Sequence, residues 1–298
     1  MVTLDFSSSK PGKRKSNPHE FSVEEYKEVN PELVKYRETK QIKIQQVNPT
    51  GISYSEKNIY MVSAEGLHVF GVNGKEILKK NFTDGATCVY ANEKHIFIGS
   101  ENYLLKLDST GQIICKSDIN PNSWFTSIAQ RNHDLYVADA GNKLILKYNT
   151  DCKKTGEFAG QSRSTVIHGF IIPSAVFDVA INPDQELWVV NPGIHALQHY
   201  RDDGSLIDFW EKTSIEIEGF SGCCNPAHIA FLPNGNLITS EKGMVRIKEY
   251  SPKGDLLSVV AEPMKFEGEK APDIAVDEQG NILALDMDKK MIRIFQPK

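Results

Sequence analysis

The chain has few cysteines and no long apolar run. Its 298 residues include five cysteines, at 88, 115, 152, 223 and 224. No two of them form a CxxC pair, so the sequence has neither a zinc-finger spacing nor an even-numbered disulfide framework. The apolar runs are short, and residues 187–190 are a typical example. A membrane-spanning helix needs about 20 such residues. We therefore expect no transmembrane segment.

The sequence also lacks the motifs of nucleotide chemistry and of secretion. It has no Gly-rich phosphate loop and no Gly-x-Ser-x-Gly nucleophile elbow, so nucleotide-dependent chemistry is unsupported. No charged head followed by an apolar stretch and a small-residue cleavage site opens the chain. We expect a soluble protein, either cytoplasmic or exported (periplasmic or extracellular) by a leader that is absent from this chain.

A strong positive charge is missing as well. Lys and Arg number 34 against 39 Asp and Glu, which gives a net charge of −5. This balance argues against a nucleic-acid partner, which is held mainly by phosphate contacts. We expect a protein or a small molecule as the partner, and no nucleic acid.

The N-terminal 40 residues differ from the rest in composition. Residues 1–20 are rich in Ser, Lys and Pro and have little apolar content, which predicts a flexible tail. In the next segment Tyr26, Val29 and Leu33 lie at helical spacing, which predicts a short helical clasp over residues 21–40.

From residue 41 onward the chain repeats itself every 40 to 50 residues or so. Each unit opens with a short apolar strand, continues through a second and a third apolar run, and in most units passes a Gly-containing turn into a fourth. This is a four-stranded antiparallel meander. The six units begin at Gly51, Cys88, Ser127, Asp178, His228 and Asp273.

Six four-stranded units predict an all-β fold, the six-bladed β-propeller, over residues 41–298. The sixth unit stops after three strands. The alternating segment 41–47 at the other end of the chain would supply its missing outer strand and close the ring without an open edge.

The third to sixth units resemble NHL repeats. Residues 135–144 follow the NHL pattern of a strand, an acidic turn with Gly-Asn, and a second strand. Four further stretches resemble a bacterial NHL-repeat family of unassigned role, whose members generally look exported; they are 177–183, 190–193, 219–226 with its Gly-Cys-Cys-Asn-Pro string, and 239–243. The family often has a further Cys where this chain has Ser221, so a three-cysteine cluster is not implied. The resemblance implies a fold and a compartment, but no activity.

In a propeller, the first residues of the inner strands form a ring at one end of the central channel. Here the ring is Gly51, Cys88, Ser127 and three ionisable residues, Asp178, His228 and Asp273. Converging carboxylates raise one another's pKa unless a cation intervenes.

We therefore expect Asp178, His228 and Asp273 to hold a divalent metal, and this mixed donor set suits zinc, iron or manganese. Gluconolactonase-like hydrolases and the NHL-type amidating lyase, two related groups of six-bladed enzymes, carry a metal at this place, although their ligand sets differ from this ring. The alternative is a water-filled polar channel.

Extra length falls in the connections that lead into the first strand of the later units. These are residues 157–175, 210–226 and 263–271. Insertions on one face of a repeat protein usually mark its binding face. We expect these connections to bring toward the channel mouth Arg163, His168, Trp210, Lys212, Cys223 and Cys224. The expected ligand-binding residues at the mouth are Cys88, Ser127, Asp178, His228, Asp273, Arg163 and His168. The competing interpretation is plain surface loops.

The adjacent cysteines Cys223 and Cys224 stand four residues before His228. One thiolate could join a metal there, or the pair could do redox work, because a disulfide between neighbours is strained and easily reduced. The alternative is two small residues that turn a loop into a strand. Cys115 and Cys152 are expected on an outer strand and in a turn, without chemistry.

Two functions compete, and the sequence does not decide whether the protein is an enzyme. The first is an NHL-type propeller that binds a small molecule or a protein through the loop-decorated face. The second is a metal-dependent hydrolase or lyase in which the metal activates a water molecule. A redox role of the cysteine pair is compatible with either.

Overall fold

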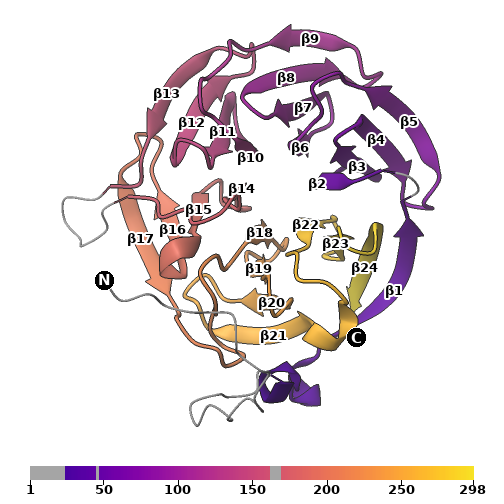
Figure 1. Cartoon of the computed structure of the whole chain (residues 1–298), viewed down its shortest axis with the longest axis vertical. Coiled ribbons are helices and arrows are strands. Elements are labelled where there is room, and N and C mark those ends of the chain that lie inside the picture. The colour runs from indigo at the N-terminus through magenta and orange to yellow at the C-terminus, as the bar shows by residue number, and fades with distance from the viewer. Residues whose placement is uncertain (1–23, 45–46, 162–168) are drawn as a thin grey trace, which may run out of the picture.

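The computed structural model describes residues 24–44, 47–161 and 169–298. Within them, 24 strands form six four-stranded antiparallel sheets around a central opening (Figure 1). The six-bladed propeller predicted from the repeats is confirmed. The predicted tail, residues 1–20, lies outside the described residues, and none of the helices in the described part is long and apolar enough to cross a membrane.

Each blade runs from an inner strand at the channel to an outer strand at the rim. The strands, blade by blade and from the inside outward, are β2 (Pro49–Ser55), β3 (Asn58–Ser63), β4 (Gly66–Gly71) and β5 (Glu76–Asn81); β6 (Cys88–Ala91), β7 (His95–Ser100), β8 (Tyr103–Asp108) and β9 (Ile113–Lys116); β10 (Phe125–Arg131), β11 (Asp134–Asp139), β12 (Leu144–Asn149) and β13 (Lys154–Phe158); β14 (Val179–Ile181), β15 (Leu187–Asn191), β16 (Ala196–Tyr200) and β17 (Leu206–Glu211); β18 (His228–Phe231), β19 (Leu237–Ser240), β20 (Ile247–Tyr250) and β21 (Leu256–Ala261); and β22 (Asp273–Val276), β23 (Ile282–Asp286), β24 (Met291–Pro297) and β1 (Tyr36–Lys43). Four short 3-10 helices accompany them in the described residues: η1 (Glu24–Lys27), η2 (Pro31–Leu33), η3 (Pro192–Ile194) and η4 (Pro263–Lys265).

Strand β1 closes the ring by pairing with β24, so the last blade contains both ends of the propeller. The closing strand lies at 36–43, five residues earlier than the predicted 41–47, and the predicted clasp is reduced to η1 and η2. The register explains the shift, because β24 continues to Pro297 and needs Tyr36 opposite it. An ion pair of 2.7 Å between Arg293 and Glu38 fastens this register.

The core lies between neighbouring blades rather than inside one sheet. The second and third strands of a blade are buried on both faces, as in β3 and β4, so they are continuous apolar runs without alternation. Outer strands such as β5 are largely exposed. Between the first two blades, Val62, Leu67, Val89 and Ile98 pack into one cluster, and burying each such side chain contributes about 1.5–3 kcal/mol.

The two ends of the channel differ in loop length. Inner strands end in tight turns, such as Glu56 and Lys57 at φ 49° and 60°, the left-handed pair typical of a two-residue hairpin. We call this end the turn face. Inner strands begin on the opposite end, the connection face, where three long connections span 159–178, 212–227 and 262–272. The predicted placement of the extra residues is confirmed.

A disulfide bond joins Cys115 on β9 to Cys152 in the turn after β12, with their Cα atoms 6.1 Å apart. It ties the rim of the second blade to the third. The expectation that these two cysteines have no chemistry was wrong. Their partnership depends on how neighbouring blades pack, which the spacing of 37 residues does not reveal.

Candidate functional site

The ring residues lie where the repeat predicts them, at the beginnings of the inner strands. Cys88, His228 and Asp273 are the first residues of β6, β18 and β22, and Asp178 immediately precedes β14. The structure brings three of the ring residues together. One donor atom each from Asp178, His228 and Asp273 lies within 4.8 Å of the other two.

The imidazole of His228 stands between the two carboxylates. Its Nδ1 is 3.6 Å from Oδ2 of Asp178 and 3.4 Å from Oδ1 of Asp273. All three side chains are largely buried, with exposed fractions of 7% to 19%. Among the described residues, neither Cys223 nor Cys224 belongs to this group, so the geometry does not support a thiolate ligand beside His228.

Both carboxylates also connect neighbouring blades. Asp178 accepts hydrogen bonds from the backbone N–H of Val179 in its own blade, at 2.8 Å, and of Ile229 in the next, at 2.7 Å. Asp273 repeats the pattern with Ile274 and Ile52. One amide N–H on each oxygen leaves further acceptor capacity on both carboxylates. The pair therefore has a structural role and can still face a cation.

Burial controls the protonation of this cluster. It raises the pKa of Asp273 to about 6, an effect that His228 opposes and Asp178 reinforces. Burial alone would lower the pKa of His228, but Asp273 and Asp178 outweigh it and raise that pKa. The buried thiol of Cys88 has its pKa raised to about 12. Cys88 is therefore a neutral packing residue and not a nucleophile.

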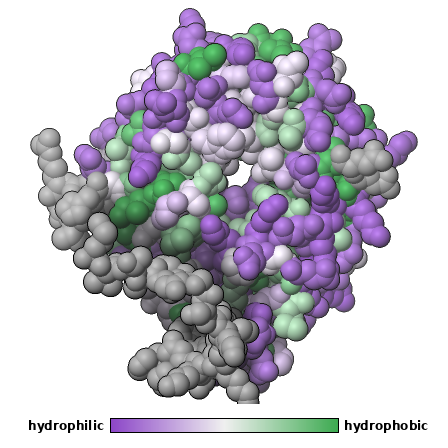
Figure 2. Space-filling view, viewed as in Figure 1, coloured by the Kyte–Doolittle hydropathy of each residue, from purple (hydrophilic) through white to green (hydrophobic). Residues whose placement is uncertain are grey.

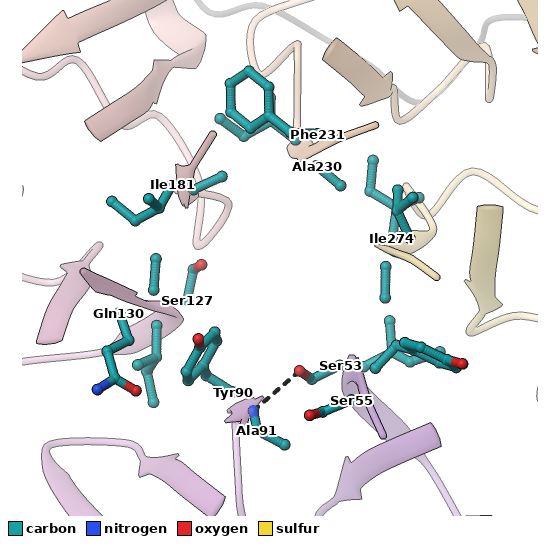
Figure 3. Close-up of a pocket in the computed structure, with 18 of the residues that line it drawn as sticks. Ser53, Ser55, Tyr90, Ala91, Ser127, Gln130, Ile181, Ala230, Phe231 and Ile274 are labelled. Atoms are coloured by element: carbon teal, nitrogen blue, oxygen red, sulfur yellow. Dashed lines mark hydrogen bonds between the residues drawn. The ribbon is translucent and has the colours of Figure 1, made fainter. Parts of the chain in front are cut away.

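The inner strands enclose a channel cavity of about 580 Å³. Its wall includes Cys88, Ser127 and the two aspartates at one end, and it extends to the hairpin turns of the turn face. Figure 3 shows Ser53, Tyr90, Ile181 and Phe231 around this space, with the Ser53 hydroxyl accepting a 3.1 Å hydrogen bond from the Ala91 N–H. Figure 2 shows an opening at the centre of the molecule.

No described residue of the three long connections, apart from Asp178 itself, lines this cavity. The expectation that these loops and the ring form one channel mouth is therefore not met. Arg163 and His168 lie outside the described residues. Trp210 points away from the channel: it is on the outer strand β17 and packs against Phe220 and Tyr250 at centroid distances of 6.0 and 5.3 Å.

Residues 169–171 of the connection that leads into β14 are held against the fourth blade by Asn191. The amide oxygen of this buried side chain accepts from the N–H of Ile171 at 2.8 Å, and its Nδ2 donates to the carbonyl of Gly169 at 3.1 Å. Gly193 allows the close approach, because a Cβ there would stand 2.6 Å from the Ile171 carbonyl oxygen. The string 190–193 is thus a docking place for the loop.

The connection 212–227 is held by a buried ionic cluster that the sequence analysis missed. Glu241 pairs with Arg246 at 2.7 Å and with Lys248 at 2.8 Å, and all three side chains are fully buried. The two cations also donate to carbonyl oxygens of the connection, which are those of Ile215, Glu216, Ile217 and Gly219. The sequence contained a signal for this cluster. Arg246 and Lys248 alternate with apolar residues in a run that the repeat places inside the blade, so each cation needs a buried partner.

Asn225 connects the stretch 219–226 to the stretch 239–243, and its carbonyl contacts His195, which follows the stretch 190–193. Its Nδ2 donates to the carbonyls of Ser221 and Lys242, and its Oδ1 accepts from the Lys242 N–H at 2.8 Å. The Asn225 carbonyl lies 2.9 Å from Nδ1 of His195. These bonds fix the backbone of Lys242 beside the two cysteines.

The cysteine pair lies on the connection face. Its sulfur atoms are 3.1 Å apart, with Cys223 exposed and Cys224 1% exposed. Burial raises the pKa of Cys224, but Ser174, Cys223 and Lys242 together outweigh it and lower that pKa. The hydrogen bond with Cys224 raises the pKa of Cys223.

No family model matches the chain, and no curated protein matches it. Solved structures do. A streptogramin B lyase has a TM-score of 0.60 at 15% identity, over 88% of this chain and 98% of the lyase. A catalytically inactive virginiamycin B lyase from Staphylococcus aureus, solved with quinupristin, has 0.63 at 16%, over 88% and 100%. The WD40 propeller domain of Doa1 has 0.58 at 11%, over 88% and 97%.

These likenesses show the fold alone. A lyase and a WD40 domain match at nearly the same score, so the fold does not separate catalysis from binding. The NHL resemblance stays a prediction.

Proposed function

We propose that this protein is a binding propeller that recognises a protein segment or a small molecule on its connection face. The observation that carries the proposal is the way residues 169–171 and the connection 212–227 are held against the blades. Burying ions is costly unless they are paired and hydrogen-bonded, and closing a six-bladed ring does not require it. Fixing loops in advance reduces the entropy that a ligand must overcome on binding.

Exposed apolar side chains on several connections of the same face support this proposal. Ile119, Trp124, Ile171 and Met264 are 40% to 74% exposed and all lie in segments that lead into inner strands. A contiguous exposed apolar patch is typical of a contact site, so the proposal requires at least two of these side chains to contact one ligand. Trp124 and Ile171 belong to neighbouring connections and are the first candidates for a shared contact.

A random peptide library displayed on phage tests this proposal. Peptides selected on the intact protein are titrated calorimetrically against the double variant Trp124→Ser/Ile171→Ser. The control is the double variant Ile113→Ser/Ile114→Ser on the outer strand β9, whose two side chains are exposed to a similar degree. We expect about tenfold weaker binding for the first variant and no change for the second. Equal losses, or a loss only with the second variant, would contradict the proposal.

A metal-dependent hydrolase or lyase is the second candidate, and a separate observation favours it. Asp178 and Asp273 line one end of a cavity large enough for a small substrate, and a donor atom of His228 lies within 4.8 Å of theirs. Zinc, iron or manganese bound there would polarise a substrate or activate water. Two of the similar structures are lyases, so the fold is compatible with catalysis of this kind.

Metal content measured by elemental mass spectrometry tests this candidate, on protein purified without an affinity metal and then offered zinc and manganese. We expect near-stoichiometric metal in the native chain and in Cys88→Ser, a ring position outside the donor group, and its loss in His228→Gln. A native chain that takes up no metal, or a His228→Gln variant that retains it, removes this candidate and leaves the binding proposal standing.

A further inference from the structure

We propose that Cys223 and Cys224 form a reversible vicinal disulfide that exchanges with low-molecular-weight thiols, with Cys223 as the sulfur that is attacked and Cys224 as the sulfur that leaves. This activity is independent of the channel and of the ligand proposed above. It rests on the sulfur contact, on the unequal exposure of the two residues and on the groups around Cys224.

The sulfur contact places the pair close to bonding. At 3.1 Å the two atoms must approach by about 1 Å to reach the disulfide distance of about 2.05 Å. Adjacent residues have Cα atoms about 3.8 Å apart across a trans peptide, below the usual range for a disulfide, so a bond between them is strained and readily reduced. Strain of this kind belongs to reversible disulfides rather than to structural ones.

The exposure of the two sulfurs sets their roles. Cys223 is exposed and Cys224 is almost completely covered, so an external thiolate can reach only the Cys223 sulfur in line with the S–S bond. Cys224 is then the leaving group. Exchange is faster when the leaving sulfur is more stable as a thiolate.

The surroundings of Cys224 provide that stability. The Lys242 ammonium lies 3.3 Å from the Ser174 hydroxyl, and both groups act on the Cys224 sulfur. Lys242 is held at its backbone by Asn225, and its neighbour Glu241 is fixed by the buried ion pairs. A cation from the turn after β19 and a hydroxyl from the connection into β14 thus lie beside one sulfur.

The exchange is balanced with a thiol as the only co-reactant. An external thiolate attacks Cys223 Sγ, a bond forms between these two sulfurs, and the Cys223–Cys224 bond breaks with its electron pair going to Cys224 Sγ beside Lys242. A second external thiolate attacks the external sulfur of this mixed disulfide and releases Cys223, which takes a proton from water. The protein disulfide is reduced by two electrons, and two external thiols are oxidised to one disulfide. The reverse sequence oxidises the dithiol.

Exchange between the full-length protein and glutathione buffers of graded redox poise tests the proposal. Samples are trapped with N-ethylmaleimide and each cysteine is read by peptide mass spectrometry. We expect the 223/224 pair to interconvert while the Cys115–Cys152 bond remains closed. A pair that stays reduced, or stays oxidised, throughout this range would overturn the proposal.

Single-cysteine variants test the roles within the pair. With glutathione disulfide, Cys224→Ser should accumulate a mixed disulfide on Cys223, whereas Cys223→Ser should form at least tenfold less on the covered Cys224. Equal adducts on the two variants would contradict the assignment. Cys224 is buried, so unchanged near-ultraviolet circular dichroism is required of its variant. The accessibility of the two sulfurs is also compared by alkylating the native reduced protein, which should label Cys223 first.

The rate at which dithiothreitol reduces the cysteine pair tests the role of Lys242. We expect Lys242→Gln to slow reduction of the pair by dithiothreitol about tenfold at neutral pH, and Lys212→Gln, on the same face, to leave the rate unchanged. Equal rates in all three proteins would show that Lys242 does not act on the leaving sulfur. These rates do not depend on peptide or metal binding, so the proposals can fail separately.

Discussion

The first three blades and the last three differ in what they add to the same repeat. The ring residues of the first half are Gly51, Cys88 and Ser127, which are neutral, and those of the second half are Asp178, His228 and Asp273. Connections follow the same division: 82–87 and 117–124 are short, whereas 159–178, 212–227 and 262–272 are long. The strands of each blade pair within that blade, so one half of the ring can carry ionisable residues and longer connections without a change in the repeat.

The two halves are also fastened differently. A disulfide at the rim connects the second and third blades, whereas buried ions connect the fifth blade to the connection before it. A covalent link restricts the unfolded chain and leaves the connection face free. The buried ions fix the connection of that face that carries Cys223 and Cys224.

We expect the largest effect on stability from removing the charge of Glu241 in the buried ionic cluster. Glu241→Gln leaves Arg246 and Lys248 buried without a full counter-charge, and we expect a loss of about 3 to 5 kcal/mol in the free energy of unfolding. Glu101→Gln, in the corresponding turn of the second blade, should change it by less than about 0.5 kcal/mol. Urea unfolding measures both. Similar losses would mean that the two halves are fastened alike.

Removing the rim disulfide should have a somewhat smaller effect. Cys115→Ser/Cys152→Ser frees a loop of 37 residues, and we expect about 2 to 4 kcal/mol of lost stability. Exchange at Cys223 and Cys224 should continue at the native rate, because the connection face does not depend on this bond. A slower exchange in the double variant would contradict the separation of rim and face.

The smallest effect concerns pH. Burial lowers the pKa of Lys248 to about 8 despite the opposing effect of Glu241. The folded protein therefore releases this proton near pH 8, and the unfolded chain keeps it until about pH 10.4. The unfolded state binds more protons in this window, so the Lys248 contribution to the free energy of unfolding increases as pH rises through it.

Comparison with Lys248→Met isolates that contribution from the other lysines. We expect the difference in stability between native protein and variant to shift in favour of the native protein between pH 8 and 10. A difference that stays constant, or shifts the other way, would show that Lys248 keeps its proton in the folded state.

The sequence predicted the blades well because most blades are built from four consecutive strands joined by short turns. Strands, hairpin turns and the ring positions follow from short apolar runs and Gly-containing turns that recur at one spacing, and the closing strand was missed by five residues only because its register depends on β24. The site was harder to predict. The spacing brought Asp178, His228 and Asp273 together correctly, but it did not separate the channel from the connection face.

The sequence by itself determined the number of blades, the ring of first residues and the face on which the extra residues lie. Periodicity and turn chemistry act over a few residues, and they suffice for these features. Only the tertiary structure decided that Cys115 meets Cys152, that Glu241 is buried between two cations, and that Ser174 and Lys242 stand beside Cys224. The disulfide joins two neighbouring blades, and Ser174 and Lys242 come from separate connections. Glu241 and its cations are neighbours in one hairpin, but their burial depends on the connection 212–227 that packs over them. Packing, and not spacing along the chain, decides these environments.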